Sequence, residues 1–415
     1  MANKMVAIGF LILGMQNPSV LIAQEGKFAE KLTESRSQLT IEGVRMTGTG
    51  GDLLRSALTD AQYVLIGEDH ATAQIPAFTS AVCAILGPQG FHTMAVEAGP
   101  MAASIVQQGI GRDDRRELIS VSERKYPDSI AFFNLQEELD MVTSCAKSAS
   151  GKTFRLWGLD QEFMGSTGMT MNRILETHPK REAAVAAQRI LDENNLAAEK
   201  AAKSGNPNEL MMMSGSDDEF TRLNEMLQKE VNLEAKRLMQ GLMVSRQIYK
   251  DNASAPRDSN RERALLMKQT FTQYYEAADK ADDSRPKVLL KFGDWHLYKG
   301  FNPLQNNDIG NFVTELADAH GTKALHIMIL AVKGTRLRFA GIGRPYAPES
   351  FKILDDDDYK FMKPFVENAG NDGWTVFDLS KLRSSSISDP NVQRLVLGYD
   401  LLVLIPEATA ATQIR

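Results

Sequence analysis

The chain has 415 residues, of which 43% are hydrophobic and 24% are charged, so it has ample material for a folded core and is not an intrinsically disordered protein. Its 30 glycines and 15 prolines follow no short period, which excludes a collagen-like chain. The formal net charge of −6 argues against a nucleic-acid-binding protein, which usually has a basic excess. Two cysteines are too few for a disulfide scaffold or a metal site built from cysteines.

The first 23 residues have the pattern of an export signal. Lys4 precedes an apolar run over residues 5–15, and the small residue Ala23 stands where cleavage would occur. The run is too short to cross a bilayer as a helix, and no later apolar segment is long enough, so we expect no integral membrane segment after removal of the signal. A first helix packed on the body is the alternative. The signal predicts a periplasmic or secreted protein, in which Cys83 and Cys145 either pair or remain buried thiols.

Short apolar runs rich in β-branched residues predict strands that are buried on both faces. In chain order they are residues 63–66, 92–96, 154–157, 288–292, 324–331 and 401–405. Helical patterns, such as the one over residues 75–86, separate most of these runs. The alternation predicts an α/β fold with a parallel or mixed sheet covered by helices on both faces. In such a sheet the ligand crevice lies at the carboxyl ends of the strands.

Between about residues 179 and 285 the strand pattern is absent and helical patterns replace it. One helix is expected over residues 180–203, a long one from 217 to about 249, and another over 261–278. We interpret this block as a helical insertion. Residues 24–415 are therefore predicted to form a single α/β domain with a helical insertion over about 179–285.

Polar side chains follow four of the predicted strands directly, at the edge where the crevice is expected. Two of these clusters are Gly-x-x-His motifs, at Gly67 to His70 and at Gly293 to His296. The glycines would allow the backbone to turn sharply out of the sheet. The side chains expected to converge on one pocket are Glu68, His70, Glu97, Asp160 and His296.

Such a set supports two kinds of chemistry. His70, His296 and Glu97 could hold a divalent metal, which would activate a bound water. Without a metal, a histidine oriented by Glu68 could activate water itself, and the second histidine could stabilise the developing oxyanion. The residues alone do not choose between these mechanisms. The simplest structural alternative is that loop acids such as Asp69 cap the helices that follow.

Other catalytic arrangements find no support in the sequence. It has no Gly-x-Ser-x-Gly nucleophile elbow, no Gly-rich dinucleotide loop after the first strand, and no phosphate-binding Gly-x-x-x-x-Gly-Lys loop. The remaining histidines are interpreted as structural or surface residues, with His326 as the reserve candidate; they are His92, His178, His320 and His326.

The two Gly-x-x-His motifs, Glu97 and the run that follows His296 resemble the superfamily of erythromycin esterase-like, ChaN-like haem-binding and TraB/TIKI proteins. The stretch that contains Arg263 is similar to the arginine-rich helix of the family, which points at the pocket. Residues 399–409 resemble the closing strand of the esterase branch. A departure is the spacing of Glu68 and His70, which have one residue between them where esterase members tend to have two. This spacing favours the ChaN-like and TraB/TIKI branches.

The resemblance implies an exported hydrolase for an ester or amide bond, either esterase-like or a TIKI-like metallopeptidase, with a small-molecule or peptide substrate. His70 would be the base or a metal ligand, Glu68 would orient it, and Glu97 would be a second ligand or base. His296 would be a ligand or would stabilise the oxyanion, and Arg263 and Asp160 would bind substrate. The alternative is a non-enzymatic protein of the ChaN-like type that binds haem or another metal-containing ligand, with His70 or His296 as axial ligand of a haem.

Overall fold

The computed structural model describes residues 18–149, 153–282, 284–370 and 373–414. Most of the predicted export signal lies outside these residues, so the signal stays a prediction. Its last residues, 18–23, begin helix α1 (Pro18–Ser35). Among the described residues no helix is sufficiently long and apolar to cross a membrane.

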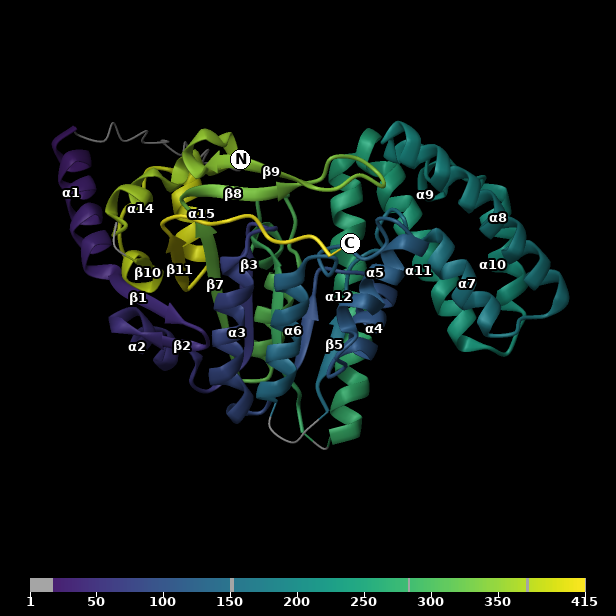
Figure 1. Cartoon of the computed structure of the whole chain (residues 1–415). Helices are drawn as coiled ribbons and strands as arrows, with labels where there is room; N and C mark the ends of the chain where they lie inside the picture. Colours follow the sequence, from purple (N-terminus) through teal and green to yellow (C-terminus); the bar gives the residue numbers. More distant parts are fainter. Residues whose placement is uncertain (1–17, 150–152, 283, 371–372, 415) are drawn as a thin grey trace, which may run out of the picture.

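The body of the molecule is a mixed sheet, with nine strands in the part of the chain that the structure describes (Figure 1). Their order is β2-β1-β10-β11-β7-β3-β6-β4-β5. The six strands from β11 to β5 are parallel, and β10, β1 and β2 continue the sheet antiparallel. A separate hairpin is formed by β8 and β9. The strands are β1 Arg36–Glu42, β2 Arg45–Thr47, β3 Ala61–Glu68, β4 Phe91–Val96, β5 Arg155–Gly158, β6 Lys287–Gly293, β7 Lys323–Ala331, β8 Lys333–Arg338, β9 Ala347–Lys352, β10 Trp374–Asp378 and β11 Leu401–Ile405.

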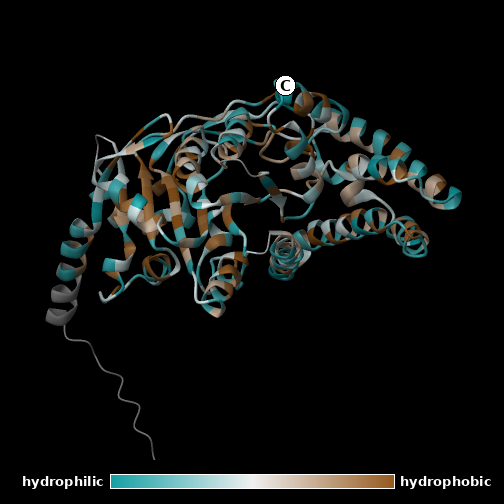
Figure 2. Ribbon diagram, turned by 90° about the horizontal axis from the view of Figure 1, so that it is seen from below, coloured by the Kyte–Doolittle hydropathy of each residue, from teal (hydrophilic) through white to brown (hydrophobic). Residues whose placement is uncertain are grey.

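Helices cover both faces of the sheet, which confirms the predicted α/β class. Brown hydrophobic residues follow the strands in Figure 2. The α-helices after α1 are α2 Gly48–Leu58, α3 Gln74–Leu86, α4 Pro100–Gly109, α5 Arg115–Lys125, α6 Gln136–Ser148, α7 Thr167–Glu176, α8 Arg181–Ser204, α9 Met211–Ser214, α10 Asp217–Gln228, α11 Leu233–Ser254, α12 Pro256–Asp282, α13 Ile309–Ala319, α14 Lys363–Asn368 and α15 Pro390–Gly398. Short 3₁₀ helices are η1 Gly87–Gln89, η2 Pro207–Glu209, η3 Asp294–Leu297, η4 Ile353–Asp355, η5 Asp357–Met362 and η6 Leu379–Leu382.

Each face of the sheet has its own hydrophobic core. On one face Phe78 of α3 and Leu139 of α6 pack with strand residues such as Val64. On the other face Phe271 of α12 and Val313 of α13 pack with the neighbouring strands. All six strands predicted from apolar runs are present, because a strand buried on both faces needs apolar residues at every position.

The helical block was also predicted, and between β5 and β6 the described residues contain helices and no strand. Helices α7 to α11 lie to one side of the sheet (Figure 1), whereas α12 packs on its face. Helices α7, α8, α10 and α11 contribute to a separate core. The expected long helix over residues 217–249 is wrong in one respect, since the chain breaks between α10 and α11. Asn232 makes the new start, because its side chain accepts hydrogen bonds from the backbone N–H groups of Glu234 and Ala235.

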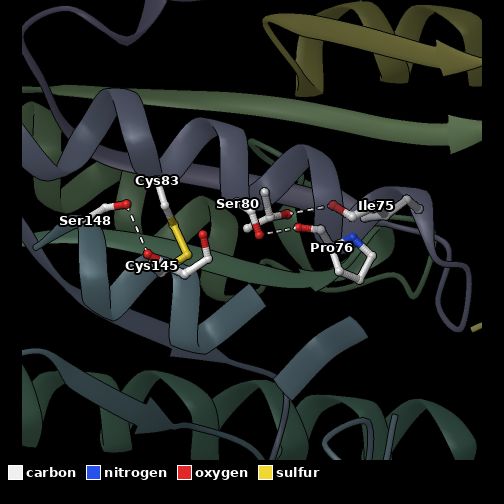
Figure 3. The surroundings of a disulfide bond; sticks show 8 residues. Ile75, Pro76, Ser80, Cys83, Cys145 and Ser148 are labelled. Carbon is white, nitrogen blue, oxygen red and sulfur yellow. Dashed lines mark hydrogen bonds between the residues drawn. A yellow bond between two sulfur atoms is a disulfide. The ribbon is translucent and has the colours of Figure 1, made fainter. Parts of the chain in front are cut away.

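Cys83 of α3 and Cys145 of α6 form a disulfide bond, which the sequence left open (Figure 3). Both residues are buried, with 5% and 3% of their surface exposed. Their helices pack side by side, and the Cα atoms of the two cysteines lie 5.0 Å apart. The bond therefore ties together two helices that lie far apart in the sequence.

We expect the double substitution Cys83→Ala and Cys145→Ala to lower the free energy of unfolding by about 3 kcal/mol, because the disulfide closes a long loop in the unfolded chain. Urea unfolding of both proteins, with and without a thiol reductant, measures this. The reductant should lower the stability of the wild type and leave the double variant unchanged. Equal stability of the two oxidised proteins would contradict the prediction.

Candidate active site

The four predicted clusters meet at the carboxyl edge of the parallel strands. Strands β3 and β6 are paired in register, with Glu68 opposite Gly293, so the loops that follow them are neighbours. Strand β4 pairs with the other side of β6, and β5 pairs with β4. The parallel arrangement thus brings His70 and His296, which are 226 residues apart in the sequence, to the same carboxylate.

That carboxylate is Glu97, which lies at the centre of the site. Its Oε2 accepts a hydrogen bond from the backbone N–H of Gly293 at 2.5 Å and lies 3.4 Å from Nε2 of His70. Its Oε1 accepts from Nη2 of Arg263 at 2.6 Å and lies 3.6 Å from Nε2 of His296. Burial works to raise the pKa of Glu97, but His296, His70 and Arg263 hold it well below its usual value. Glu97 is therefore an ionised acceptor between two histidines and an arginine.

His70 is held on three sides. Its Nδ1 lies 2.9 Å from Oε1 of Glu68, and its ring stacks on Phe132 with the ring centroids 4.3 Å apart. The side chain of His70 is 29% exposed, against 4% for Glu68 and 7% for Glu97. Burial works to lower the pKa of His70, but Glu97 and Glu68 raise it well above its usual value. A Glu68 carboxylate at Nδ1 leaves Nε2, the nitrogen on the side of Glu97, as the one that can accept a proton.

His296 lies deeper and has both ring nitrogens engaged. Nδ1 lies 2.8 Å from Oδ2 of Asp308, and Nε2 lies 3.1 Å from Nη1 of Arg263. Because a guanidinium only donates, Nε2 is the acceptor in that contact and Nδ1–H donates to Asp308. Burial works to lower the pKa of His296, while Asp308 raises it and the net shift is upward. Asn302 donates to the same Asp308 oxygen and to the carbonyl of Trp295, which fixes the loop.

Arg263 reaches the site from α12, as the resemblance implied. Its guanidinium turns inward, where it donates to Glu97, His296 and Asp160. Asp160, only 5% exposed, accepts from Nε and Nη2 of the same guanidinium. In this arrangement Arg263 and Asp160 hold the site together. Their expected contacts with a substrate stay a prediction.

Gly67 and Gly293 matter to the site because they have no side chain. Neither has a positive φ, so the expectation that glycine is needed there for a special backbone turn is wrong. A Cβ atom at Gly67 would lie 2.3 Å from the hydroxyl of Tyr399. A Cβ atom at Gly293 would lie 3.0 Å from Nε2 of His70 and 3.2 Å from Oε2 of Glu97. A side chain is therefore excluded at Gly67 by its neighbours, and at Gly293 it would press on His70 and Glu97.

The alternative that Asp69 caps the following helix is also wrong. Helix α3 begins at Gln74 with Ala73 as its N-cap, and Asp69 accepts a hydrogen bond from Arg336 of β8 at 3.0 Å. The reserve candidate His326 does not join the site. It is fully buried, its ring nitrogens contact Leu297 and Thr314, and burial lowers its pKa to about 3.

Four residues around the site were not predicted. They are Phe132, Glu138, Lys291 and Asp308. Lys291 had a visible signal, since it is the single charged residue inside the apolar run 288–292. Asp308 gave no signal of a contact with His296; it also caps α13, where it accepts a hydrogen bond from the N–H of Ile309. Glu138 and Phe132 gave no signal, because their importance depends on contacts between distant segments.

The arrangement does not fit a bound metal ion. A cation held by His70, His296 and Glu97 needs free lone pairs on those residues. Arg263 already donates to Nε2 of His296 and Oε1 of Glu97, and the N–H of Gly293 donates to the second oxygen. Across the described ranges, no group of three or more His, Cys, Asp or Glu side chains could hold a metal. The expected divalent metal stays a prediction, and nothing proposed below depends on it.

No family model matches this chain, and no curated protein matches it by sequence. Solved structures do match. A mutant of the erythromycin esterase EreC in its open conformation aligns with a TM-score of 0.61 and 16% identity, over 92% of this chain and 99% of that one. The chain has the fold of an erythromycin esterase. A protein described as a succinoglycan biosynthesis protein (TM-score 0.59, 14% identity, 95% and 99% covered) and a Bacillus cereus protein (0.58, 14%, 94% and 99%) share this esterase-type fold.

The esterase-type fold supports the esterase part of the resemblance. At 14–16% identity these structures show a shared fold, and they do not assign a role to any residue of this chain. The likenesses to ChaN-like and TraB/TIKI proteins stay predictions.

Glu162, in the loop behind Glu97, makes the stability of the protein depend on pH. It is 5% exposed, its Oε1 accepts from the N–H of Met101, and its Oε2 has no hydrogen-bond partner among the described residues. Burial raises its pKa from 4.5 to about 7. The folded protein therefore keeps a proton that the unfolded chain loses, and stability falls as the pH rises through this interval.

We expect the wild type to lose about 2–3 kcal/mol more unfolding free energy between pH 5 and pH 8 than a Glu162→Gln variant does, since one pKa unit corresponds to about 1.4 kcal/mol. Urea unfolding at several pH values measures the two slopes. Parallel curves would show that Glu162 ionises normally in the folded protein.

Proposed function

We propose that this protein is a hydrolase for ester bonds and that His70 is its general base. The observation that carries the proposal is the setting of His70. The side chain of His70 is more exposed than those of Glu68 and Glu97. Contacts with Glu68, Glu97 and Phe132 fix its imidazole at the carboxyl edge of the sheet. A partly exposed histidine oriented by a carboxylate is the arrangement that activates water. The fold shared with an erythromycin esterase supports the same reaction class.

The reaction follows from the donors and acceptors around His70. In its neutral form, His70 donates from Nδ1–H to Glu68, and the lone pair on Nε2 takes a proton from water while the water oxygen attacks the ester carbonyl. Because Glu97 and Glu68 raise the pKa of His70 well above its usual value, the neutral form and the rate of hydrolysis increase as the pH rises. Glu97, 3.4 Å from Nε2, stabilises the imidazolium that forms. Arg263, a fixed cation with its side chain 21% exposed, stabilises the negative charge on the carbonyl oxygen. The imidazolium then protonates the leaving alkoxide, which releases an alcohol and a carboxylic acid.

The haem-binding alternative is not favoured by the site. An axial ligand needs a free ring nitrogen that faces an open face. Nε2 of His296 accepts from Arg263, and Nδ1 donates to Asp308. His70 has Glu68 at one nitrogen and Glu97 near the other. An added haem would have to displace these contacts.

We further propose that the protein is exported, to the periplasm or out of the cell. The basic residue and apolar run at the N-terminus support this location, and so does the disulfide, since disulfides persist mainly in oxidising compartments. Expression of the full chain in a bacterium, followed by fractionation and N-terminal sequencing, tests it. A mature protein that begins after Ala23 is expected. An uncut cytoplasmic protein would contradict the proposal.

The function is tested by assaying the purified protein on a panel of p-nitrophenyl esters of increasing acyl length, a macrolactone, and matching anilides. Ester hydrolysis is expected in the presence of EDTA, because the proposed steps use only side chains of this chain. Cleavage of anilides alone would assign an amidase instead. Activity that EDTA abolishes and a divalent metal restores would replace this mechanism with a metal-dependent one.

A further inference from the structure

Lys291 is an unusual residue for the place it occupies. It lies in β6, in the middle of the sheet, opposite Ile66 of β3 and Val96 of β4. Its side chain is only 4% exposed, and the burial pattern of its strand is that of an apolar core strand. A lysine at such a position is rarely buried unless its ammonium group is paired.

The ammonium group is paired with two carboxylates. Nζ donates to Oε1 of Glu68 at 2.5 Å and to Oε1 and Oε2 of Glu138 at 2.7 and 3.0 Å. Glu138 lies in the first turn of α6 and is 4% exposed, as is Glu68. These three charged groups form a buried ion cluster. The cluster contacts His70 directly, because Oε1 of Glu68 accepts from Lys291 and also contacts Nδ1 of His70.

Stability alone does not account for this cluster. Taking three charged groups out of water is costly, and apolar side chains of similar size at these positions often give equal or greater stability. The cluster instead fixes the relative positions of the elements that surround His70. Lys291 joins the end of β3 to the start of α6, and α6 directly follows the loop that carries Phe132, the ring on which His70 stacks.

We propose that Lys291 and Glu138 are positioning residues of this site: they fix the Glu68 carboxylate against Nδ1 of His70, so that Nε2 is the nitrogen that accepts the proton. The inference rests on the proposed function. In this role neither residue touches the substrate. Glu138 anchors the ammonium group from the helix side, and Lys291 in turn holds the Glu68 oxygen to which Nδ1–H donates. Loss of either contact lets Glu68 turn away and lets the ring of His70 take either tautomer.

The test compares Lys291→Met and Glu138→Gln with matched controls. Lys299→Met removes another ion-paired lysine, whose partner is Asp400, and Glu137→Gln alters the neighbouring residue of α6. For an ester that the wild type hydrolyses, we expect kcat to fall about 100-fold in Lys291→Met and about 10-fold in Glu138→Gln, with KM changed less than about 3-fold. Both controls should retain wild-type kcat.

A second readout does not depend on activity. ¹⁵N NMR of the histidine rings should show neutral His70 as the Nδ1–H tautomer in the wild type and a mixture of tautomers in both variants. An unchanged tautomer in Glu138→Gln, which keeps the shape of the side chain, would overturn the inference even if Lys291→Met did not fold. Unchanged kcat in both variants would also overturn it. A wild type without hydrolase activity would refute the proposed function, and the tautomer would still decide the positioning role.

Discussion

A His70→Gln variant should lose about 10²–10⁴-fold in kcat for ester hydrolysis, which is the contribution expected of a general base. Glutamine can still donate a hydrogen bond to Glu68 and lie against Phe132, but its amide cannot accept a proton from water at neutral pH. Because the imidazolium pairs with the buried Glu97 and Glu68, which raise its pKa, the substitution should also lower the free energy of unfolding at neutral pH, by about 1–3 kcal/mol. Steady-state kinetics and urea unfolding of the same preparation measure both quantities.

His178→Gln provides the matched control, since His178 is exposed and lies after α7, outside the site. It should have wild-type kcat and KM. If His70→Gln kept a tenth or more of the wild-type rate, His70 would not be the base. A loss confined to KM would instead indicate that His70 binds the substrate in its ground state.

The fold was predictable where residues are buried on both faces. Runs such as residues 288–292 and 401–405 are apolar at nearly every position, and each became a parallel strand. Strands β1 and β9 were missed because they are exposed on at least one side, and their sequences, RSQLTIE and APESFK, contain no apolar run. Strand β10 is buried over only three residues, which is too short for a pattern to distinguish it from a helix.

The site was predictable to the extent that its residues directly follow strands. The convergence of Glu68, His70, Glu97 and His296 could be predicted because parallel strands end at the same edge. The groups that hold them could not be found in this way, since Lys291 contacts Glu68 across 223 residues and Glu138 across 153. Only the pairing of β3 with β6 and the packing of α6 bring these partners together.

An Arg263→Met variant should be destabilised by about 3–5 kcal/mol, because removing one member of a buried ion cluster leaves the others without compensation. Glu97 and Asp160 are 7% and 5% exposed, and both accept hydrogen bonds from the Arg263 guanidinium. Methionine fills the volume of the stem and supplies no charge. Arg261→Met is the matched control on the same helix, since Arg261 is exposed, and its stability should change by less than about 0.5 kcal/mol.

The dependence on pH separates this explanation from a simple loss of packing. In the wild type, Arg263 and the two histidines hold the pKa of Glu97 well below its usual value, so the ionised carboxylate contributes stability at neutral pH that is lost as the pH falls through the lowered pKa. Without Arg263 this contribution shrinks, and the buried carboxylates bind protons more readily. The difference in unfolding free energy between wild type and Arg263→Met should therefore be largest near pH 7 and smaller at pH 4. A difference that did not change with pH would mean that Arg263 stabilises the protein through its aliphatic stem, and that its charge is not what holds Glu97 and Asp160 in place.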